Sequence, residues 1–139
     1  MPGFRATDIN RRTTLDLDER KKVLLVDDDE AVVTYLVTKL AKNYRLASTT
    51  QPRSVVELAK RERPDVILCD IDMPDFSGGD VAAALAEDPL TRGIPFIYLT
   101  SLVSPEEASE MGGYVGGRRG IAKRAPLGEL LKQIEEATR

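Results

Sequence analysis

The sequence predicts an α/β fold in which a parallel β-sheet is covered by helices on both faces. Short continuous apolar runs alternate along the chain with segments whose apolar residues recur at helical spacing. Two of these runs, residues 23–26 and 66–69, show no polar alternation, which is typical of strands buried on both faces. Both runs end in aspartate, and open parallel sheets place their chemistry at the carboxyl ends of the strands. Together these observations indicate a parallel sheet with right-handed crossover connections.

Strands and helices are expected to alternate along the chain. Five strands are predicted, at residues 23–26, 44–48, 66–69, 96–99 and 120–123. Five helices are predicted to follow them, starting near residues 29, 52, 80, 104 and 126. Asp28 or Asp29 is placed to cap the first helix, and Pro52 and Pro126 suit the first turns of two others. The strand at 44–48 has the weakest pattern, and the glycine-rich segment 112–120 is expected to be the least regular part.

Composition and length set the class of protein. The chain has 139 residues, 42% hydrophobic and 31% charged, which suits a single globular domain. Residues 1–20 are polar, so we predict a flexible N-terminal extension over 1–20 and one folded domain over 21–139. The net charge of −3 gives no reason to expect nucleic-acid binding, and no run of 18 apolar residues indicates a membrane span. Cys69, the single cysteine, fits a reducing compartment, so a cytoplasmic protein is expected.

Polar residues lie at the carboxyl ends of four of the predicted strands, on one edge of the sheet: Asp27, Asp28, Asp70, Thr100 and Lys123. An aspartate that follows a strand is also common in ordinary loops, but a second strand ending in acid favours a site. Converging carboxylates repel by roughly 4 kcal/mol per close pair at an effective dielectric near 20, so a cation is expected among them. The chain contains no histidine, and oxygen ligands favour Mg²⁺ or Mn²⁺. A divalent ion, an ammonium and a hydroxyl around one carboxylate suit phosphoryl transfer to that carboxylate.

The spacing of these residues resembles the receiver domain of response regulators in two-component signalling. The resemblance covers about residues 21–138 and implies a flavodoxin-like (βα)5 doubly wound sheet with strand order 2-1-3-4-5. The positions that match the family pattern are, in chain order, Asp27, Asp28, Asp70, Met73, Pro74, Gly78, Thr100 and Lys123. Each match alone is weak, and their order and spacing make the signal specific.

The resemblance implies that Asp70 accepts a phosphoryl group from a phosphohistidine on a sensor histidine kinase or phosphotransfer protein. Thr100 is then expected to hydrogen-bond the phosphoryl group, and Lys123 to pair with it. Such a chain is a signalling domain rather than an enzyme, with only slow self-phosphorylation and autodephosphorylation.

The resemblance also implies the ligands of the ion. Asp28 and Asp70 are expected to bind Mg²⁺ directly, together with the backbone carbonyl of Asp72. Asp27 is expected to act through water or as a further ligand. Asp72 adds another acid beside the site, which we expect to slow attack on an anionic donor or to alter hydrolysis.

Two positions depart from the family pattern. Gly120 stands where the family usually has an aromatic residue that swings inward, and Arg124 stands where a cis proline usually follows the lysine. A cis bond to a residue other than proline costs about 2.5–4 kcal/mol, so we predict a trans bond between Lys123 and Arg124. These departures motivate an alternative hypothesis, a degenerate receiver that acts as a phosphorylation-independent protein-binding module.

Two further interpretations stay open at this point. Asp70-Ile71-Asp72 is similar to the Asp-x-Asp pair of Mg²⁺-dependent haloacid-dehalogenase phosphatases, although that family usually carries it after the first strand. Arg118, Arg119 and Arg124 form a basic cluster that is either a solvated surface or a docking face. A docking face there would take a partner or a second copy of the chain, giving a homodimer.

Overall fold

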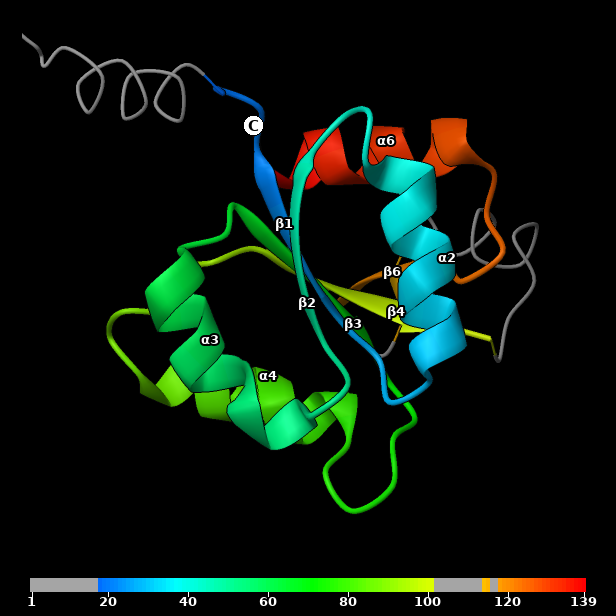
Figure 1. Ribbon diagram of the computed structural model, residues 1–139. Helices are drawn as coiled ribbons and strands as arrows, with labels where there is room; N and C mark the ends of the chain where they lie inside the picture. The colour runs from blue at the N-terminus through cyan, green and yellow to red at the C-terminus, as the bar shows by residue number, and fades with distance from the viewer. Residues whose placement is uncertain (1–17, 102–113, 116–117) are drawn as a thin grey trace, which may run out of the picture.

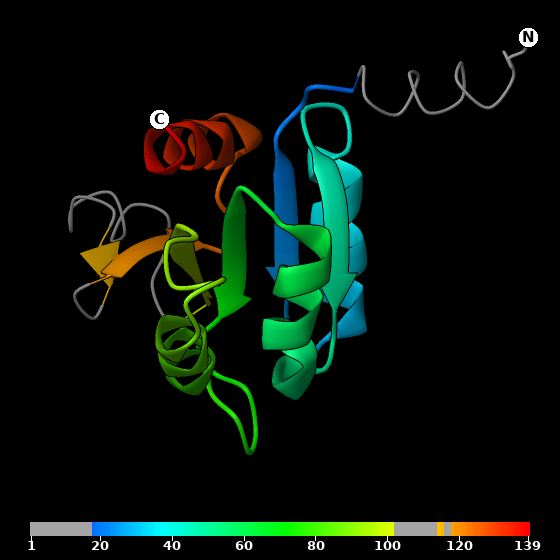
Figure 2. The same ribbon diagram turned by 90° about the vertical axis from the view of Figure 1, so that its left-hand side faces the viewer.

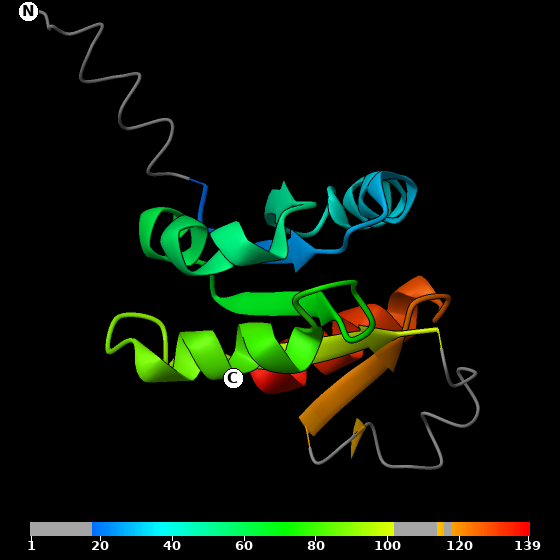
Figure 3. The same ribbon diagram turned by 90° about the horizontal axis from the view of Figure 1, so that it is seen from below.

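The computed structural model describes residues 18–101, 114–115 and 118–139, with the backbone alone at 114, 115 and 118. In this part of the chain the strands are β1 (Lys22–Val26), β2 (Arg45–Thr49), β3 (Val66–Asp70), β4 (Phe96–Thr100), β5 (Tyr114–Val115) and β6 (Arg118–Ala122). They form one sheet in the order β2-β1-β3-β4-β6-β5. Figure 3 shows the first five strands of this order in sequence across the molecule.

The predicted strand order 2-1-3-4-5 is confirmed, with β6 as the fifth parallel strand. The pairs β1–β2, β1–β3, β3–β4 and β4–β6 are all parallel. In Figure 2 the arrowheads of β1, β2 and β3 point the same way, so their carboxyl ends lie at one edge. The short strand β5, which the sequence did not predict, pairs antiparallel to β6 and adds an outer strand. The bounds predicted for the fifth strand, residues 120–123, were wrong, because β6 begins at Arg118 and ends at Ala122.

Helices cover both faces of the sheet, as the alternation of elements predicts. They are α2 (Glu30–Leu40), α3 (Val55–Glu62), α4 (Gly78–Glu87) and α6 (Leu127–Ala137), with a single 3-10 turn, η1 (Pro52–Ser54), before α3. Helices α2 and α6 lie on one face, and α3 and α4 lie on the other (Figure 1). The helix predicted to start near residue 104 lies outside the described residues. Among the described helices, none has the length and apolar content needed to cross a membrane.

The continuous apolar runs are explained by two hydrophobic clusters, one on each face of the sheet. Along β3, Val66 and Leu68 pack with α2 and α6 residues such as Leu36 and Leu130. Ile67 and Cys69 point the other way, into the cluster that includes residues of α3 and α4. Every residue of β3 is therefore buried. Because both faces of β3 are apolar, its charged residue, Asp70, lies at the carboxyl end of the strand.

Local signals determine where the helices begin. The Asp29 side chain caps α2 by accepting a hydrogen bond of 2.9 Å from the backbone N–H of Ala31, which selects one of the two predicted caps. Helix α4 begins at Gly78, two residues before the predicted start at residue 80. The reason is a capping box, in which Ser77 and Asp80 each accept a hydrogen bond from the other's backbone N–H.

Candidate functional site

The carboxyl ends of four parallel strands bring the predicted site residues to one edge. Asp27 directly follows β1, and Asp70 is the last residue of the neighbouring β3. Thr100 ends β4, and Lys123 directly follows β6. The register pairs Asp70 with Leu99 and Thr100 with Ala122, so these strand ends lie level with one another. The sequence places these side chains at one edge because each comes just after an apolar run.

A lysine bridges two buried carboxylates at this edge. The Lys123 ammonium lies 2.8 Å from Oδ2 of Asp27 and 3.2 Å from Oδ1 of Asp70. The side chains of the two aspartates are only 1% and 5% exposed, so little water is available to solvate them. Backbone N–H groups complete the arrangement, because Asp29 donates to Asp27 at 2.9 Å and Asp72 donates to Asp70 at 3.3 Å.

The edge carries more negative than positive charge. Ligand oxygens of Asp27, Asp28 and Asp70 lie within 4.8 Å of one another, and only Asp28 is exposed. With Lys123 as the neighbouring cation, three carboxylates and one ammonium leave a formal excess of two negative charges. Burial raises the pKa of Asp70 and the charge of Asp27 adds to this, outweighing Lys123 and the Asp72 N–H. Burial alone would lower the pKa of Lys123, but Asp27 and Asp70 raise it, so the ammonium stays charged.

The donor set at this edge fits a hard divalent cation. The clustered groups are carboxylates, which Mg²⁺ and Mn²⁺ prefer, and Asp28 is open to solvent, from which an ion arrives. The nearby thiol of Cys69 is buried, and burial raises its pKa, so it stays protonated and is a poor ligand. The backbone N–H of Asp72 points to Asp70, while the role predicted for its carbonyl stays a prediction.

Backbone contacts fix the groups around Asp70. The buried Thr100 accepts a hydrogen bond of 2.8 Å from the Lys123 N–H through its carbonyl oxygen, which ties the two strand ends together. The loop after β3 folds back so closely that a Cβ at Gly78 would overlap the carbonyl oxygen of Asp70 and lie 2.8 Å from Ile71 Cα. Gly78 also donates to the Ile71 carbonyl at 2.8 Å. The glycine of the family motif is therefore required by backbone packing beside the acceptor.

The loop after β3 is also held by a contact with the segment after β2, which the sequence did not predict. The guanidinium of Arg53, in η1, lies 4.8 Å from the ring centroid of Phe76. A cation over an aromatic face is attracted by the ring. This contact links the segment after β2 to the loop after β3. No local sequence signal predicts it, because the two residues are far apart in the chain.

The two departures from the family pattern have clear structural settings. Gly120 is buried and lies opposite Tyr98 in the β4–β6 register. Tyr98 is buried too, and its ring packs edge-on against Phe96 with centroids 5.3 Å apart. The described residues contain no cis peptide bond, so the Lys123–Arg124 bond is trans, as predicted.

The basic cluster is not a single surface. Arg119 turns toward α6, where it lies 3.1 Å from Gln133 and 3.4 Å from Glu136. Arg124 is exposed, and the side chain of Arg118 lies outside the described residues. Part of the cluster therefore stabilises the packing of β6 on α6.

A family of known proteins matches this chain. The family model described as "Response regulator receiver domain" matches residues 23–135. The chain is 39% identical over 82 residues to the response regulator PleD of Caulobacter vibrioides, covering 58% of this chain and 18% of PleD. It is 32% identical over 114 residues to the protein PilH of Pseudomonas aeruginosa, covering 81% of this chain and 93% of PilH. The chain thus spans less than a fifth of PleD and nearly all of PilH.

Solved structures agree with the sequence relatives. The chemotaxis protein CheY4 of Vibrio cholerae superposes with a TM-score of 0.70 at 27% identity, covering 85% of this chain and 98% of CheY4. The N-terminal domain of a response regulator receiver protein from Methanoculleus marisnigri gives a TM-score of 0.62 at 32% identity, covering 84% of this chain and 94% of that chain. Both likenesses cover more than four fifths of this chain. The fold is therefore the flavodoxin-like fold of CheY.

Receiver domains are signalling domains whose general role in two-component systems is to accept a phosphoryl group. They bind Mg²⁺ at an acidic pocket and interact with histidine kinases or phosphotransfer proteins. The acidic edge described here has the composition of such a pocket. Since the family model matches most of the length of this chain, the chain belongs to the response regulator receiver domains.

Proposed function

We propose that this chain accepts a phosphoryl group on Asp70, in a Mg²⁺-dependent reaction, from the phosphohistidine of a sensor histidine kinase or phosphotransfer protein. One observation carries the proposal: the Lys123 ammonium bridges Asp27 and Asp70 at the edge where three carboxylates gather. Burial and the charge of Asp27 raise the pKa of Asp70, so the charged form of this carboxylate is stabilised by any positive charge that binds beside it. A group that binds there and supplies positive charge is expected to be held firmly.

The proposed ligands of Mg²⁺ are Asp28, Asp70 and the backbone carbonyl of Asp72, with Asp27 acting directly or through water. When bound, the ion supplies positive charge that offsets the charge on the phosphoryl oxygens. The exposed Asp28 is open to solvent, whereas Asp27 and Asp70 are buried. Three carboxylates with a single ammonium favour binding of a divalent cation on charge grounds alone.

The proposed transfer uses one oxygen of Asp70. Among the described residues, Lys123 and the Asp72 N–H both contact Oδ1, so Oδ2 is left to attack phosphorus. The new O–P bond forms as the P–N bond to the donor histidine breaks, and the leaving imidazole takes a proton from water. Lys123 then pairs with a phosphoryl oxygen and Thr100 donates its hydroxyl hydrogen to another. Both residues are already fixed at the strand ends by the hydrogen bond between them.

Incubation with acetyl phosphate and Mg²⁺, followed by intact mass, tests the proposal. We expect the folded wild type to gain one phosphoryl group and the Asp70→Asn variant to gain none. Asp75→Asn is the matched control, because Asp75 is an exposed carboxylate in the same loop with a positive φ of 68° that asparagine tolerates. An unchanged mass for folded wild type with several phosphodonors, or equal labelling of Asp70→Asn, would overturn the proposal.

The burial of Gly120 favours one second candidate, a phosphorylation-independent binding module. At the place opposite Tyr98 there is no side chain that could move when Asp70 changes state. Amide NMR spectra before and after phosphorylation separate the two functions. Shifts that reach α6 support a phosphorylation switch, and shifts confined to the strand ends around Asp70 support the module.

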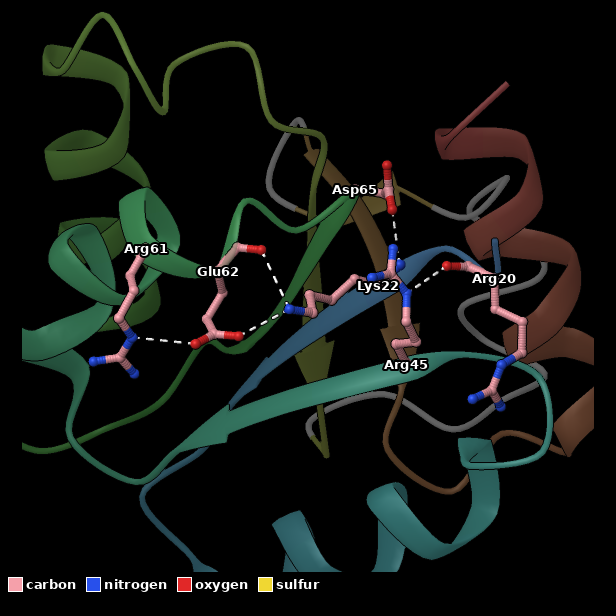
Figure 4. A network of polar contacts seen from close by, with 6 residues as sticks. All are labelled: Arg20, Lys22, Arg45, Arg61, Glu62 and Asp65. Carbon is pink, nitrogen blue, oxygen red and sulfur yellow. Dashed lines mark hydrogen bonds and ion pairs between the residues drawn. The ribbon is translucent and has the colours of Figure 1, made fainter. Parts of the chain in front are cut away.

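We also propose that the receiver spans residues 21–139, with residues 1–20 as an extension. Contacts with the rest of the domain begin close to this boundary, where the Arg20 carbonyl accepts a hydrogen bond of 2.7 Å from Arg45 (Figure 4). The Lys21 ammonium donates to the Thr138 carbonyl at 2.9 Å, and Lys22 pairs with Glu62 at 2.9 Å. The family match begins close by, at residue 23. A cytoplasmic location is part of the same proposal, since a single buried thiol suits a reducing compartment.

A further inference from the structure

In the loop between β6 and α6, the segment from Lys123 to Ala125 makes three hydrogen bonds to or from its backbone within the described part of the chain. The Lys123 N–H donates to the Thr100 carbonyl at 2.8 Å, and the Ala125 N–H donates to the Ala122 carbonyl at 3.0 Å. The third bond comes from another element, because the Lys39 ammonium of α2 donates to the Ala125 carbonyl at 2.9 Å. Lys39 is thus a side-chain anchor for a loop 86 residues away in the sequence.

Lys39 is itself held in place on α2. Its ammonium lies 2.8 Å from the hydroxyl oxygen of Tyr35, one turn earlier, and 4.9 Å from the centroid of the Tyr35 ring. It also lies in the last turn of the helix, where a cation is favourable. A lysine with these contacts has already lost much of its rotamer freedom, so its bond to Ala125 restricts the loop more effectively than a freely moving lysine would.

The anchored carbonyl is two residues from Lys123. Ala125 is 1% exposed and packs in the hydrophobic cluster with residues of α2 and α6. Arg124, which lies between Lys123 and Ala125 in the sequence, is exposed. The segment from Lys123 to Ala125 therefore has one end fixed by β4 and the other fixed by α2. Movement of Ala125 would shift the backbone from which the Lys123 side chain reaches Asp27 and Asp70.

We propose that Lys39 is a positioning residue for Lys123, holding the loop after β6 so that the Lys123 ammonium stays between Asp27 and Asp70. Lys39 contacts neither carboxylate and acts through the backbone of Ala125. The inference rests on the proposed function, in which Lys123 pairs with the phosphoryl group. It adds a residue of α2 to the residues that determine the rate of transfer.

Substitution of Lys39 tests the proposal by two independent measurements. Lys39→Met keeps the aliphatic stem and removes the donor, and we expect phosphorylation by acetyl phosphate to slow by about tenfold, the scale on which small misplacements act. Lys39→Arg keeps a cationic donor and should recover part of the rate. Lys42→Met is the control, because Lys42 is exposed and makes no hydrogen bond or ion pair within the described part of the chain. A rate for Lys39→Met equal to that of wild type overturns the proposal.

A double-mutant comparison separates positioning from a general loss of stability. If Lys39 acts through Lys123, Lys39→Met should slow the reaction in the wild type but have no further effect when Lys123 is already methionine. Equal slowing in both backgrounds would mean that Lys39 only stabilises the fold, and would overturn the proposal.

Amide hydrogen exchange gives a result that needs no phosphodonor. We expect the Lys123 and Ala125 amides to exchange about tenfold faster in Lys39→Met than in wild type, because the loop loses its anchor. Unchanged exchange at both amides would overturn the positioning role. If wild type took no phosphoryl group at all, the proposed function would fail while the exchange result still decided whether Lys39 holds the loop.

Discussion

The amino ends and the carboxyl ends of the parallel strands form two opposite edges of the sheet, and their charged groups differ in burial and in how far they are neutralised. At the amino ends of β1 and β3, Lys22 pairs with Glu62 at 2.9 Å, and the Lys22 N–H donates to Asp65 at 2.7 Å (Figure 4). These side chains are partly solvated, and the carboxylates there have donors of their own. At the carboxyl ends, three carboxylates gather around Lys123 and two of them are almost fully buried. At the amino ends each of these carboxylates has a cationic or N–H donor of its own and serves the fold, whereas the carboxyl ends keep an excess of negative charge that suits a site.

The pKa values of two acids express this difference. Hydrogen bonds from Lys22 and Arg61 hold the pKa of Glu62 below its usual range, so its charged form stabilises the fold. Burial and the charge of Asp27 raise the pKa of Asp70, so its charged form destabilises the fold. The comparison therefore predicts that neutralising Glu62 lowers the free energy of unfolding, whereas neutralising Asp70 raises it.

The largest expected effect comes from backbone packing at the site edge. Gly78→Ala should lower the free energy of unfolding by about 2–3 kcal/mol, because the new methyl group would overlap the Asp70 carbonyl and press on Ile71. Gly93→Ala, in the loop before β4 at the opposite edge, should change stability little, because nothing lies within 4 Å of the added Cβ. Urea unfolding at constant m-value measures both. Equal losses for the two variants would break the contrast between the edges.

Gly78 also shows what the sequence could and could not predict. Apolar runs and helical spacing predicted the five parallel strands and both faces of helices, because burial on both faces leaves a strong local pattern. The Ser77–Asp80 capping box was visible in the sequence and would have placed the start of α4 correctly. The close approach of Gly78 to Asp70 was not predictable, because it depends on the path of a folded loop.

The side-chain partners of the site were less predictable than its members. The carboxyl ends of the strands identified Asp27, Asp70 and Lys123, since each follows an apolar run. The sequence did not indicate that Lys123 would contact both aspartates, or that Lys39 would reach the Ala125 carbonyl. Such contacts join elements far apart in the chain, and short-range patterns contain no information about them. The pairing of β5 with β6 was missed for a different reason, because Val115 and its partner Arg118 are close in sequence but the many glycines in residues 112–120 predicted an irregular segment there.

The next effect is smaller and depends on pH. Without metal at pH 7, Asp70→Asn should be more stable than wild type by on the order of 1 kcal/mol, because it removes a charge that the folded state disfavours. The sign follows from the raised pKa: the penalty is full above the folded-state value and disappears as the pH falls toward the ordinary value of 3.8. The two proteins should therefore converge in acid, as followed by thermal unfolding in chelator.

Magnesium should reverse the order of these two proteins. The ion stabilises the state that binds it, and Asp70→Asn lacks one of the three clustered carboxylates. Asp75→Asn serves as the control, because the loop carboxylate it neutralises is exposed. If Asp70→Asn were less stable than wild type in chelator at pH 7, the excess of negative charge would not destabilise the folded state. The contrast between the carboxyl ends and the amino ends of the strands would then be wrong.

The smallest effect is expected at the amino ends of the strands, where Lys22 pairs with Glu62. Lys22→Met should lower the free energy of unfolding by less than about 1 kcal/mol, because the Lys22 and Glu62 side chains are 21% and 26% exposed and water competes for the pair. A double-mutant cycle with Glu62→Gln isolates the coupling between the two residues. That coupling should shrink in 1 M salt, where the screening length is about 3 Å. The stability that Glu62 contributes should be lost as the pH falls below its ordinary value of 4.5, the reverse of the trend for Asp70. A coupling that salt leaves unchanged would mean that this edge is as dry as the site, and the two edges would then differ in charge balance alone.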